Sequence, residues 1–375
     1  MTSTLVLKNT EILPHIAAPL LRWYHSQARV LPWREEPSPY RVWISEIMLQ
    51  QTRVEAVKPY FERFLAALPD VRALAAVPDE TLMKLWEGLG YYNRAHNLKK
   101  AAQIILQKHQ GTIPADFEEL LQLPGIGRYT AGAISSIAWH QPHPAVDGNV
   151  LRVITRIIAC PEDILKERTK RAVEQALRTC MPPDAGAFNQ ALMELGAMIC
   201  LPKGTAHCTS CPLLRLCLAF EQERVTEFPY KAAKKNRRIE KLTIFYIECG
   251  DKIAIHQRPS QGLLANLWEL PNLPGRLTRS EVKKYLDLQG MTPQMISALP
   301  AHKHVFSHIE WHMTGWYIRI NPQQLKESPS SYLSTDQIPL VWSTKPELTA
   351  LYSFSSAFHH YLFANTAGKF RQIAK

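Results

Sequence analysis

The chain has 375 residues, which is enough for two or three domains that each bury a core. Its 44 Lys and Arg residues outnumber 33 Asp and Glu, and the formal net charge of +11 favours a polyanionic partner. No apolar run is long enough to span a bilayer, and the first residues lack the basic and apolar regions of a signal peptide. These features argue against a membrane or secreted protein, and we expect an intracellular, cytoplasmic one.

Residues 10–223 carry apolar side chains at three- and four-residue spacing, with Pro and Gly at the breaks, a pattern that predicts helices. Ser38 and Pro39 predict the N-cap and the first residue of a helix that continues through VWISEIMLQQT. Glu46 lies in this stretch among apolar residues. Such a glutamate is either solvated on the helix surface or desolvated. Desolvation would raise its pKa and keep it protonated as a general acid.

The stretch LPGIGRYTAGA (residues 123–133) places Gly125 and Gly127 between two helical segments. The amides of these glycines are unobstructed by Cβ atoms and, with the start of the following helix, can cradle one phosphate. A turn that contains glycine is also an ordinary connection between two helices, so the pattern alone leaves both roles open.

About twenty residues after this hairpin, Asp147 in AVDGNV is predicted to cap a helix, and apolar residues flank it. Glu46 and Asp147 together suggest a division of labour. A neutral acid donates a proton to a leaving group, and an anion stabilises positive charge on a sugar, as in glycoside hydrolysis. An ordinary helix cap without chemistry is the alternative for Asp147.

Four of the seven cysteines lie close together in the sequence: Cys200, Cys208, Cys211 and Cys217. Clustered cysteines of a reducing compartment bind metal more often than they pair with one another. Structural zinc favours two short pairs, and only Cys208 and Cys211 form one, so the spacing favours an iron–sulfur cluster with zinc as the alternative. We expect the remaining three to be buried thiols: Cys160, Cys180 and Cys249.

Around residues 227–241 the composition changes, and KAAKKNRRIEK predicts an exposed basic linker that contacts solvent or phosphate. Beyond it the pattern is typical of strands. LTIFYIE and KIAIHQR flank a Cys-Gly-Asp turn and predict a β-hairpin, and HVFSHIEWHMTGWYIRI continues as strands. With helices expected at residues 279–288 and 349–363, the last third is predicted to be a separate α/β domain.

The ordered set LPWR, WISEIMLQQTRV, WEGLGYYNRAHNL, LPGIGRYTAGA and AVDGNVLRV, followed by the four-cysteine loop, resembles the helix-hairpin-helix DNA glycosylases of the endonuclease III superfamily. Within that superfamily it is most similar to the MutY-type adenine glycosylases. The resemblance implies a mainly α fold, with a glycosylase core at 1–226 that includes a [4Fe-4S] loop at 200–217. A basic linker at 227–240 and an α/β Nudix-like 8-oxoguanine recognition domain at 241–375 would follow.

The resemblance also implies base excision repair of double-stranded DNA, with hydrolysis of the N-glycosidic bond of adenine mispaired with 8-oxoguanine or guanine. Glu46 would protonate the adenine at N7 and Asp147 would stabilise the cationic sugar, while Tyr129 and Asn149 support them. Strand-cutting relatives carry a lysine in the hairpin, where this chain has Tyr129. Because a phenol cannot form a Schiff base, we expect a monofunctional enzyme without efficient lyase activity. We also expect a monomer that is nucleoid-associated in a bacterium.

The DNA-binding residues that the resemblance implies are Arg34, Gln51, Thr52, Tyr91, Gly125, Gly127, Phe306, Ser307 and His308. Ser307 can donate and accept hydrogen bonds and would test the altered edge of 8-oxoguanine. Arg34, Gln51 and Tyr91 can equally be ordinary surface or core residues. The family usually has six residues between its first two cysteines, whereas this chain has seven, which leaves open the phosphate contacts of Lys203 and Arg215.

Three alternative functions are weighed against this reading. A glycosylase for another mismatched base has the same motifs, whereas a non-catalytic helix-hairpin-helix protein would need neither Glu46 nor Asp147. A Nudix hydrolase needs a glutamate-rich helix to hold magnesium, and residues 275–290 offer only Glu281 and Asp287. A metal site built from His302, His304, His308 and His312 is a further alternative, disfavoured because matching Cys or carboxylate ligands are missing from the spacing.

Overall fold

The computed structural model describes residues 5–202, 206–233, 236–322 and 339–362. The chain forms two compact units. The first contains Met1–Val77 and Arg94–Lys234, and the second contains Pro78–Asn93 and Lys235–Lys375. In the part that is described, no helix has both the length and the apolar character that a bilayer crossing requires.

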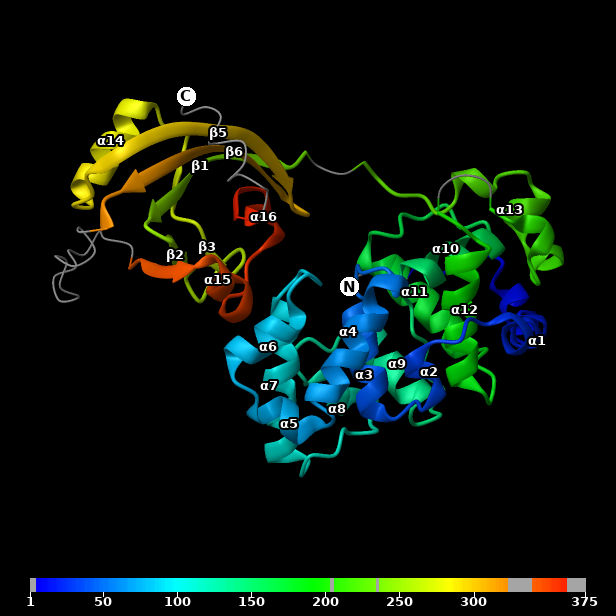
Figure 1. The fold of residues 1–375 in the computed structure, drawn as a ribbon. Helices are drawn as coiled ribbons and strands as arrows, with labels where there is room; N and C mark the ends of the chain where they lie inside the picture. The colour runs from blue at the N-terminus through cyan, green and yellow to red at the C-terminus, as the bar shows by residue number, and fades with distance from the viewer. Residues whose placement is uncertain (1–4, 203–205, 234–235, 323–338, 363–375) are drawn as a thin grey trace. The chain divides into compact units, whose positions relative to one another are not determined.

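The first unit is helical, as the sequence predicts (Figure 1). Its helices are α1 (Ala17–Gln27), α2 (Pro32–Glu35), α3 (Pro39–Leu49), α4 (Val54–Ala67), α5 (Val71–Ala76), α7 (Asn93–Lys108), α8 (Phe117–Leu121), α9 (Arg128–Ile137), α10 (Gly148–Ile157), α11 (Glu167–Arg178), α12 (Ala185–Met198) and α13 (Leu218–Glu221). Short 3-10 helices lie at Thr10–His15, Cys208–Ser210, Leu214–Leu216 and Val225–Glu227. The second unit takes α6 (Asp79–Trp86) from this stretch of sequence.

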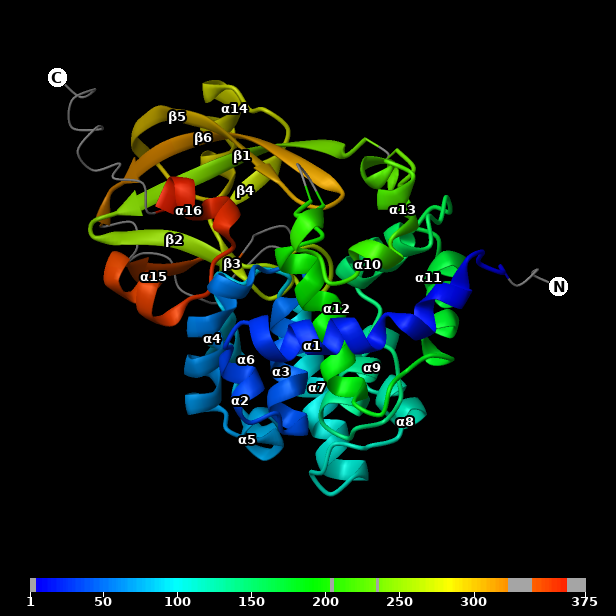
Figure 2. The same cartoon turned by 90° about the vertical axis from the view of Figure 1, so that its right-hand side faces the viewer.

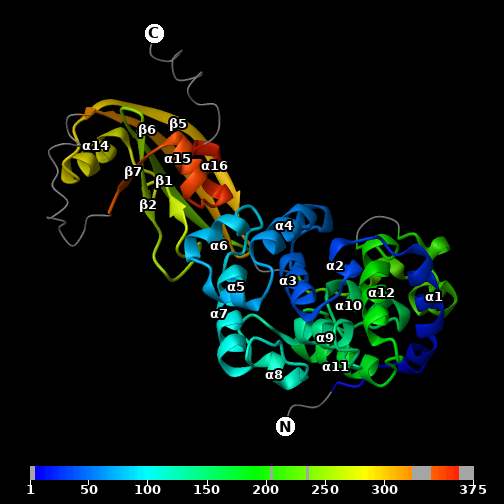
Figure 3. The ribbon, with the colours of Figure 1, turned by 60° about the horizontal axis from the view of Figure 1, so that its bottom comes forward.

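A core of apolar side chains from α1, α10, α11 and α12 holds one half of the helical unit together. The inner turns of α12 are almost wholly buried because its sequence, AGAFNQALMELGAM, is apolar on nearly every side. Helix α12 also packs against α9, and α9 packs against α3 (Figure 3). The four helices α3, α9, α10 and α12 are therefore neighbours, and their facing sides enclose the candidate site.

Two helix starts follow the capping chemistry expected from the sequence. The Ser38 hydroxyl accepts a hydrogen bond from the Arg41 amide, and Pro39 opens α3. Asp147 caps α10, because its Oδ1 accepts from the Val150 amide at 2.7 Å. Both predicted caps are confirmed.

The described residues of the second unit form a mixed sheet with the order β3-β2-β1-β6-β5, while β4 pairs with β1 and β7 with β2. The strands are β1 (Arg238–Cys249), β2 (Lys252–Gln257), β3 (Trp268–Glu269), β4 (Asn272–Pro274), β5 (Pro293–Val305), β6 (Ile309–Ile320) and β7 (Val341–Thr344). The expected hairpin is confirmed as β1 and β2. Strand β1 starts earlier than LTIFYIE, because Arg238 already pairs in parallel with Ile309 of β6.

Alternating side chains of β1 supply both faces of the sheet. Leu242, Ile244 and Tyr246 belong to one apolar cluster, whereas Phe245 and Ile247 belong to another. Helix α14 (Arg279–Leu288) covers the second cluster and α16 (Ser356–Leu362) the first, so the two helices lie on opposite faces (Figure 2). The predicted α/β domain is thus confirmed.

Two expectations about this part of the chain and about the thiols are corrected. The single helix predicted at 349–363 is two helices, α15 (Lys345–Leu351) and α16, because Phe354 between them is extended and bridges to Trp268 of β3. Cys160 and Cys249 are buried as expected, but Cys180, two residues beyond the end of α11, is only half-buried.

The segment Pro78–Asn93 is joined to the sheet domain by polar contacts that the sequence did not reveal. The Glu87 carboxylate accepts a hydrogen bond from the Phe354 amide at 3.1 Å, and the Tyr92 hydroxyl donates to the Phe354 carbonyl at 3.3 Å. The ammonium group of Lys84 pairs with Glu87 and donates to the Thr349 carbonyl. This segment therefore belongs to the same compact unit as β1–β7.

Candidate active site

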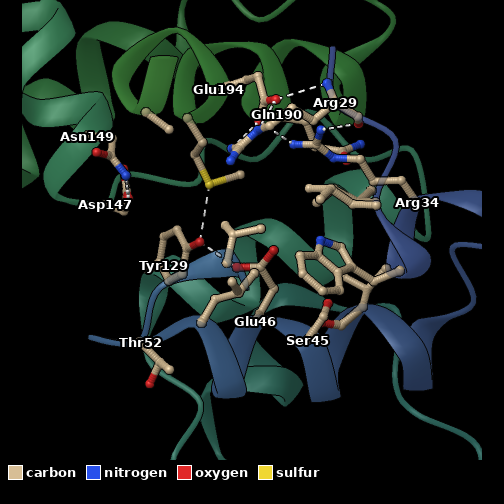
Figure 4. Close-up of a pocket in the computed structure, with 18 residues that line it drawn as sticks. Arg29, Arg34, Ser45, Glu46, Thr52, Tyr129, Asp147, Asn149, Gln190 and Glu194 are labelled. Atoms are coloured by element: carbon tan, nitrogen blue, oxygen red, sulfur yellow. Dashed lines mark hydrogen bonds and ion pairs between the residues drawn. The ribbon is translucent and has the colours of Figure 1, made fainter. Parts of the chain in front are cut away.

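Residues of α2, α3, α4, α9, α10 and α12 line a cavity of about 160 Å³ that receives both predicted carboxylates. Figure 4 shows the side chains that line it. Glu46 comes from α3, Tyr129 from α9, Asp147 and Asn149 from the start of α10, and Glu194 from α12. These positions are far apart in the sequence and meet because the helices pack as described above. A cavity of about 150 Å³ admits a benzene ring, so this one has room for an aromatic ring.

Glu46 is 5% exposed and sits within the apolar part of α3. Burial raises its pKa to about 7, and the nearby Asp147 adds to the rise. A hydrogen bond from Tyr129 and the charge of Arg34 act in the opposite direction. The side chain is therefore a desolvated acid that holds a proton near neutral pH, and the solvated alternative does not apply.

The Tyr129 hydroxyl lies between two side chains of the cavity. It hydrogen-bonds Glu46 Oε2 on one side and lies 3.2 Å from the sulfur of Met193, a residue of α12, on the other (Figure 4). Burial raises the pKa of Tyr129 well above its ordinary value, so this phenol stays protonated. Tyr129 thus contacts the acid directly, whereas Met193 was not singled out by the sequence analysis.

Asp147 is held by groups of its own helix. Besides the Val150 amide, its Oδ2 accepts a hydrogen bond from the Asn149 side chain at 2.7 Å. Burial raises the pKa of Asp147, and these hydrogen bonds oppose the rise. Asn149 is fixed in turn by Arg152, whose guanidinium donates to Asn149 Oδ1 at 2.9 Å.

Gly196 of α12 explains how the start of α10 comes so close to the neighbouring helix. A Cβ atom at this position would lie 2.6 Å from the Cβ of Asn149, a distance that side chains do not tolerate. The carbonyl of Gly196 also accepts a hydrogen bond from Arg152 at 2.7 Å. A glycine at this point of the sequence therefore sets the position of Asp147 and Asn149 in the cavity.

A buried ion pair closes another side of the cavity. Glu194 is 1% exposed and receives two hydrogen bonds from the Arg29 guanidinium, at 2.7 and 2.9 Å, and one from Arg34 at 2.9 Å. Burial alone would raise the pKa of Glu194, but these hydrogen bonds outweigh it and lower the pKa to about 2. Arg34 therefore lines the cavity rather than the outer surface.

Sequence reasoning missed Arg29, Glu194, Gln190 and Met193, all of which line the cavity. The sequence signal that could have revealed them was Glu194, a single charged residue inside the apolar stretch ALMELGAM. A carboxylate buried there without a partner would destabilise the fold, so its position predicts a cationic partner.

The hairpin connects α8 to α9. Gly125 has a φ of +79°, and a Cβ atom there would lie 2.8 Å from Asn97, so glycine is required. Gly127 caps α9 with an ordinary φ, and a Cβ atom there would meet nothing within 4 Å. Gly127 is exposed, so the start of α9 is open to solvent on this side.

The turn after α3 carries Gln51 and Thr52. Gln51 is exposed with a φ of +59°, and Thr52 reaches the rim of the cavity. Arg94 holds this turn, because its guanidinium donates to the carbonyls of Ile47, Met48 and Gln50 at 2.7–3.0 Å.

Comparisons with known proteins show which families this chain resembles. Residues 44–181 match the HhH-GPD superfamily of base excision DNA repair proteins, and residues 243–364 match the NUDIX domain family. A protein named adenine DNA glycosylase from Buchnera aphidicola (subsp. Schizaphis graminum) is 33% identical over 296 residues, which cover 78% of this chain and 84% of that protein. The chain belongs to the adenine DNA glycosylase family.

Two further relatives extend the comparison. The adenine DNA glycosylase of Mus musculus is 34% identical over 355 residues and covers 78% of this chain and 68% of its own length. A solved structure of a trapped endonuclease III–DNA covalent intermediate is 26% identical with a TM-score of 0.50, and it covers 58% of this chain and 99% of the other. The helix-hairpin-helix core and the Nudix-like domain are thus established.

Two of the four clustered cysteines, Cys200 and Cys217, contact Arg156 of α10. The Arg156 guanidinium lies 3.1 Å from the sulfur of Cys200. The backbone carbonyl oxygen of Arg156 lies 3.6 Å from the sulfur of Cys217. Burial raises the pKa of Cys211 to about 12, and its three neighbouring thiols contribute to the rise. Thiols such as these become ligands only when they lose their protons, which a bound cation favours. Lys203 lies outside the described residues.

The Nudix-like domain presents the predicted Phe-Ser-His segment as a tight turn between β5 and β6, which we call the β5–β6 turn (residues 306–308). The Phe306 amide donates to the Ile309 carbonyl at 2.8 Å, and the Phe306 ring packs edge-on against Trp311. Ser307 and His308 are exposed. The Ser307 hydroxyl lies 3.3 Å from that of Tyr91, which is itself 47% exposed, so the structure brings these two predicted residues together.

Other candidates of this domain have structural partners. The Glu281 carboxylate accepts from the amide and hydroxyl of Thr278 in a capping box at the start of α14, which occupies it as a helix cap. His302 stacks on His360, whereas His312 faces Glu310. Within the described ranges no three His, Cys, Asp or Glu residues, the four clustered cysteines included, form a group that could hold one metal ion.

Proposed function

We propose that this protein is a base excision repair glycosylase that hydrolyses the N-glycosidic bond of adenine mispaired with 8-oxoguanine or guanine. One observation carries the proposal: Glu46, with a pKa of about 7, shares a cavity with Asp147. Burial raises the pKa of both carboxyls. The hydrogen bonds from the Val150 amide and the Asn149 side chain favour the charged form of Asp147, which suits Glu46 to the role of acid and Asp147 to that of anion.

In this mechanism Glu46 donates its proton to N7 of the adenine, and the bond between C1′ and N9 breaks. The pair of electrons leaves with the base, and Asp147 stabilises the oxocarbenium-like sugar. A water molecule then adds to C1′ and returns a proton to Glu46. Tyr129 orients Glu46 and Asn149 orients Asp147 through the hydrogen bonds described above.

The cavity supports the binding of a base that has left the DNA stack. Arg34 and Glu194 give it polar groups, and a ring-sized space lies next to them. Among the described residues, the Nε atom of Arg34 is buried without a hydrogen-bond partner. A base that accepts a hydrogen bond at this point would satisfy it, since buried donors are costly when unpaired.

We propose that Ser307 and Tyr91 read the base opposite the adenine, with Phe306 and His308 shaping the turn. The exposed Ser307 hydroxyl can donate to one atom and accept from another, as the edge of 8-oxoguanine requires. Gln51 and Thr52 would contact the gap left by the extruded base, and the amides at Gly125 and Gly127 a phosphate. The partner is thus a damaged duplex, bound by a monomer.

The position of Tyr129 supports hydrolysis without strand cutting. A lyase needs an amine that attacks C1′, and no lysine is present among the described residues that line the cavity. We therefore propose a monofunctional enzyme.

We also propose a [4Fe-4S] cluster held by Cys200, Cys208, Cys211 and Cys217. Bound there, it supplies the positive charge that thiolates in this half-buried loop require. Arg152 of α10 donates to the Cys200 carbonyl at 2.7 Å and so links the loop to the helix of Asp147. A purified protein is expected to be brown with iron and sulfide in equal amounts, and a colourless, zinc-loaded, active protein would contradict the cluster.

One assay tests the function directly. Duplexes that contain each mismatch are incubated with the protein, and strand breaks are compared with and without alkali. Alkali-dependent breaks at adenine opposite 8-oxoguanine are expected, and breaks without alkali would contradict monofunctional action. Release of another base would favour the general mismatch glycosylase, and tight binding without release would favour a DNA-binding protein.

A further inference from the structure

The Tyr129 hydroxyl has two neighbours that can each accept its hydrogen bond. Glu46 Oε2 accepts a hydrogen bond when the carboxyl is ionised, and the Met193 sulfur, 3.2 Å away, is an acceptor in every state. A phenol carries a single hydrogen, so it cannot donate fully to both. The protonation state of Glu46 therefore decides the direction of the hydrogen bonds.

When Glu46 is ionised, Tyr129 donates to it and the sulfur is left with a weak contact. When Glu46 is protonated, its own O–H becomes a donor and needs an acceptor. The Tyr129 oxygen can accept the hydrogen bond from Glu46 only if the phenol hydrogen points away from Glu46. In that orientation the phenol donates to the Met193 sulfur. The thioether thus completes a chain from Glu46 through Tyr129 to sulfur that exists only for the protonated acid.

We propose that Met193 is a positioning residue that favours the protonated form of Glu46 in the free protein, before the acid turns to the adenine, by accepting the hydrogen of Tyr129. The inference rests on the proposed function of Glu46 as the acid. It assigns a task to a side chain that no sequence pattern marked. Met193 itself touches no reacting atom in this scheme and acts through Tyr129.

The other groups that face Glu46 do not provide this effect. Asp147 disfavours the ionised form and Arg34 favours it, but both act through charge and neither accepts the phenol hydrogen. Glu194 is saturated by Arg29 and Arg34 on the far side of the cavity. A change of Met193 to an apolar residue leaves these charges in place and removes only the acceptor.

The first test is Met193→Leu, a swap of similar volume that cores tolerate well. The kcat/KM for adenine release, whose pH dependence reports the pKa of the acid in the free enzyme, is measured from pH 5 to pH 9. The midpoint of the alkaline fall in rate should move down by about 0.5 unit, which corresponds to part of one hydrogen bond. Well above the midpoint the rate should fall about threefold, and below it the rate should be unchanged. Met193→Ile tests the same loss if the leucine variant does not fold.

Two controls separate this role from plain packing. Met198→Leu makes the same change at the end of the same helix, outside the cavity lining, and should leave the profile unchanged. In a Tyr129→Phe background, Met193→Leu should cause no further shift, because the phenol that carries the effect is gone. A rate loss that is equal at all pH values, or a shift that persists in the phenylalanine background, would overturn the proposal.

Infrared difference spectra of the free protein provide a readout that needs no substrate. The carboxyl C=O band of Glu46, isolated by comparison with Glu46→Gln, gives its titration midpoint with and without Met193. A lower midpoint in Met193→Leu supports the proposal, and an unchanged one refutes it. If the wild-type protein released no adenine, the proposed function would fail, while this titration would still decide the inference.

Discussion

The cavity around Glu46 and the β5–β6 turn around Ser307 place their polar groups in opposite environments. Glu46 and Glu194 are buried and Asp147 is half-buried, and burial and neighbouring groups have moved the pKa of each. Ser307 and Tyr91 are exposed, and their hydroxyls face each other on the surface of the other unit. Proton transfer near neutral pH requires a shifted pKa and hence burial, whereas reading a base requires hydrogen-bonding atoms that the base can reach.

This contrast predicts that substitutions in the cavity change the rate or its dependence on pH. Substitutions at the turn should instead change the preference between opposite bases.

Glu46→Gln should reduce adenine release by about 10²–10⁴-fold, the usual contribution of a general acid. An amide of the same shape cannot donate a proton to N7, but it preserves the packing of α3. Single-turnover excision and duplex binding are measured together, and binding should stay near the wild-type value. Near-normal turnover would remove Glu46 from the acid role.

The same substitution should stabilise the protein at alkaline pH. Folding raises the pKa of Glu46 from 4.5 to about 7. The folded state therefore holds the proton more tightly, and stability falls as the pH rises through that window. Above pH 7 the full penalty is of the order of 3 kcal/mol at 1.36 kcal/mol per pKa unit, and glutamine avoids it.

The measurement is the urea midpoint of wild type and Glu46→Gln at pH 5 and pH 8. The variant should gain most at pH 8 and little at pH 5. Glu62→Gln changes an exposed glutamate of α4 and serves as the matched control, for which no pH-dependent gain is expected. An equal gain at both pH values would mean that Glu46 is not the desolvated acid described here.

Ser307→Ala should reduce the preference for 8-oxoguanine over guanine about fivefold, because one hydrogen bond contributes about 1 kcal/mol. Ser307→Thr keeps the hydroxyl and should retain most of the preference. The ratio of excision rates opposite the two bases is compared among the three proteins. An alanine variant with an unchanged ratio would show that the turn does not read the base.

Glu87→Ala should lower the same ratio by roughly twofold, since it removes the acceptor of the Phe354 amide and loosens the segment that carries Tyr91. The effect should shrink when Ser307 is already alanine, because both changes act on one pair of hydroxyls. Glu80→Ala, at an exposed position of α6, the helix that ends next to Glu87, is the control. If the effects of Glu87→Ala and Ser307→Ala on the excision ratio were fully additive, the two changes would not act on the same pair of hydroxyls.

Much of the architecture was predictable because its signals are local. Helix periodicity, the cap at Asp147 and the strand pattern of β1 and β2 depend on neighbours in the sequence, and the structure confirms them. The burial of Glu46 was one of two stated alternatives, and the apolar residues around it were the reason to consider it. The break between α15 and α16 was missed because it depends on the pairing of Phe354 with Trp268, a residue of a strand far away in the sequence.

The remaining parts of the cavity depend on contacts between distant positions. Glu194 meets Arg29 across 165 residues, and Met193 meets Tyr129 across 64. No local pattern encodes such pairs, because either residue alone has an ordinary helical environment. A charged residue inside an apolar helix was the sole local sign of this network.

The membership of Pro78–Asn93 in the sheet unit has a practical consequence for anyone who dissects this protein. Cutting the gene at the basic linker yields a C-terminal piece that lacks α6 and Tyr91. A chimaera meant to borrow the reading of the opposite base would need two separate inserts, taken from both sides of the linker.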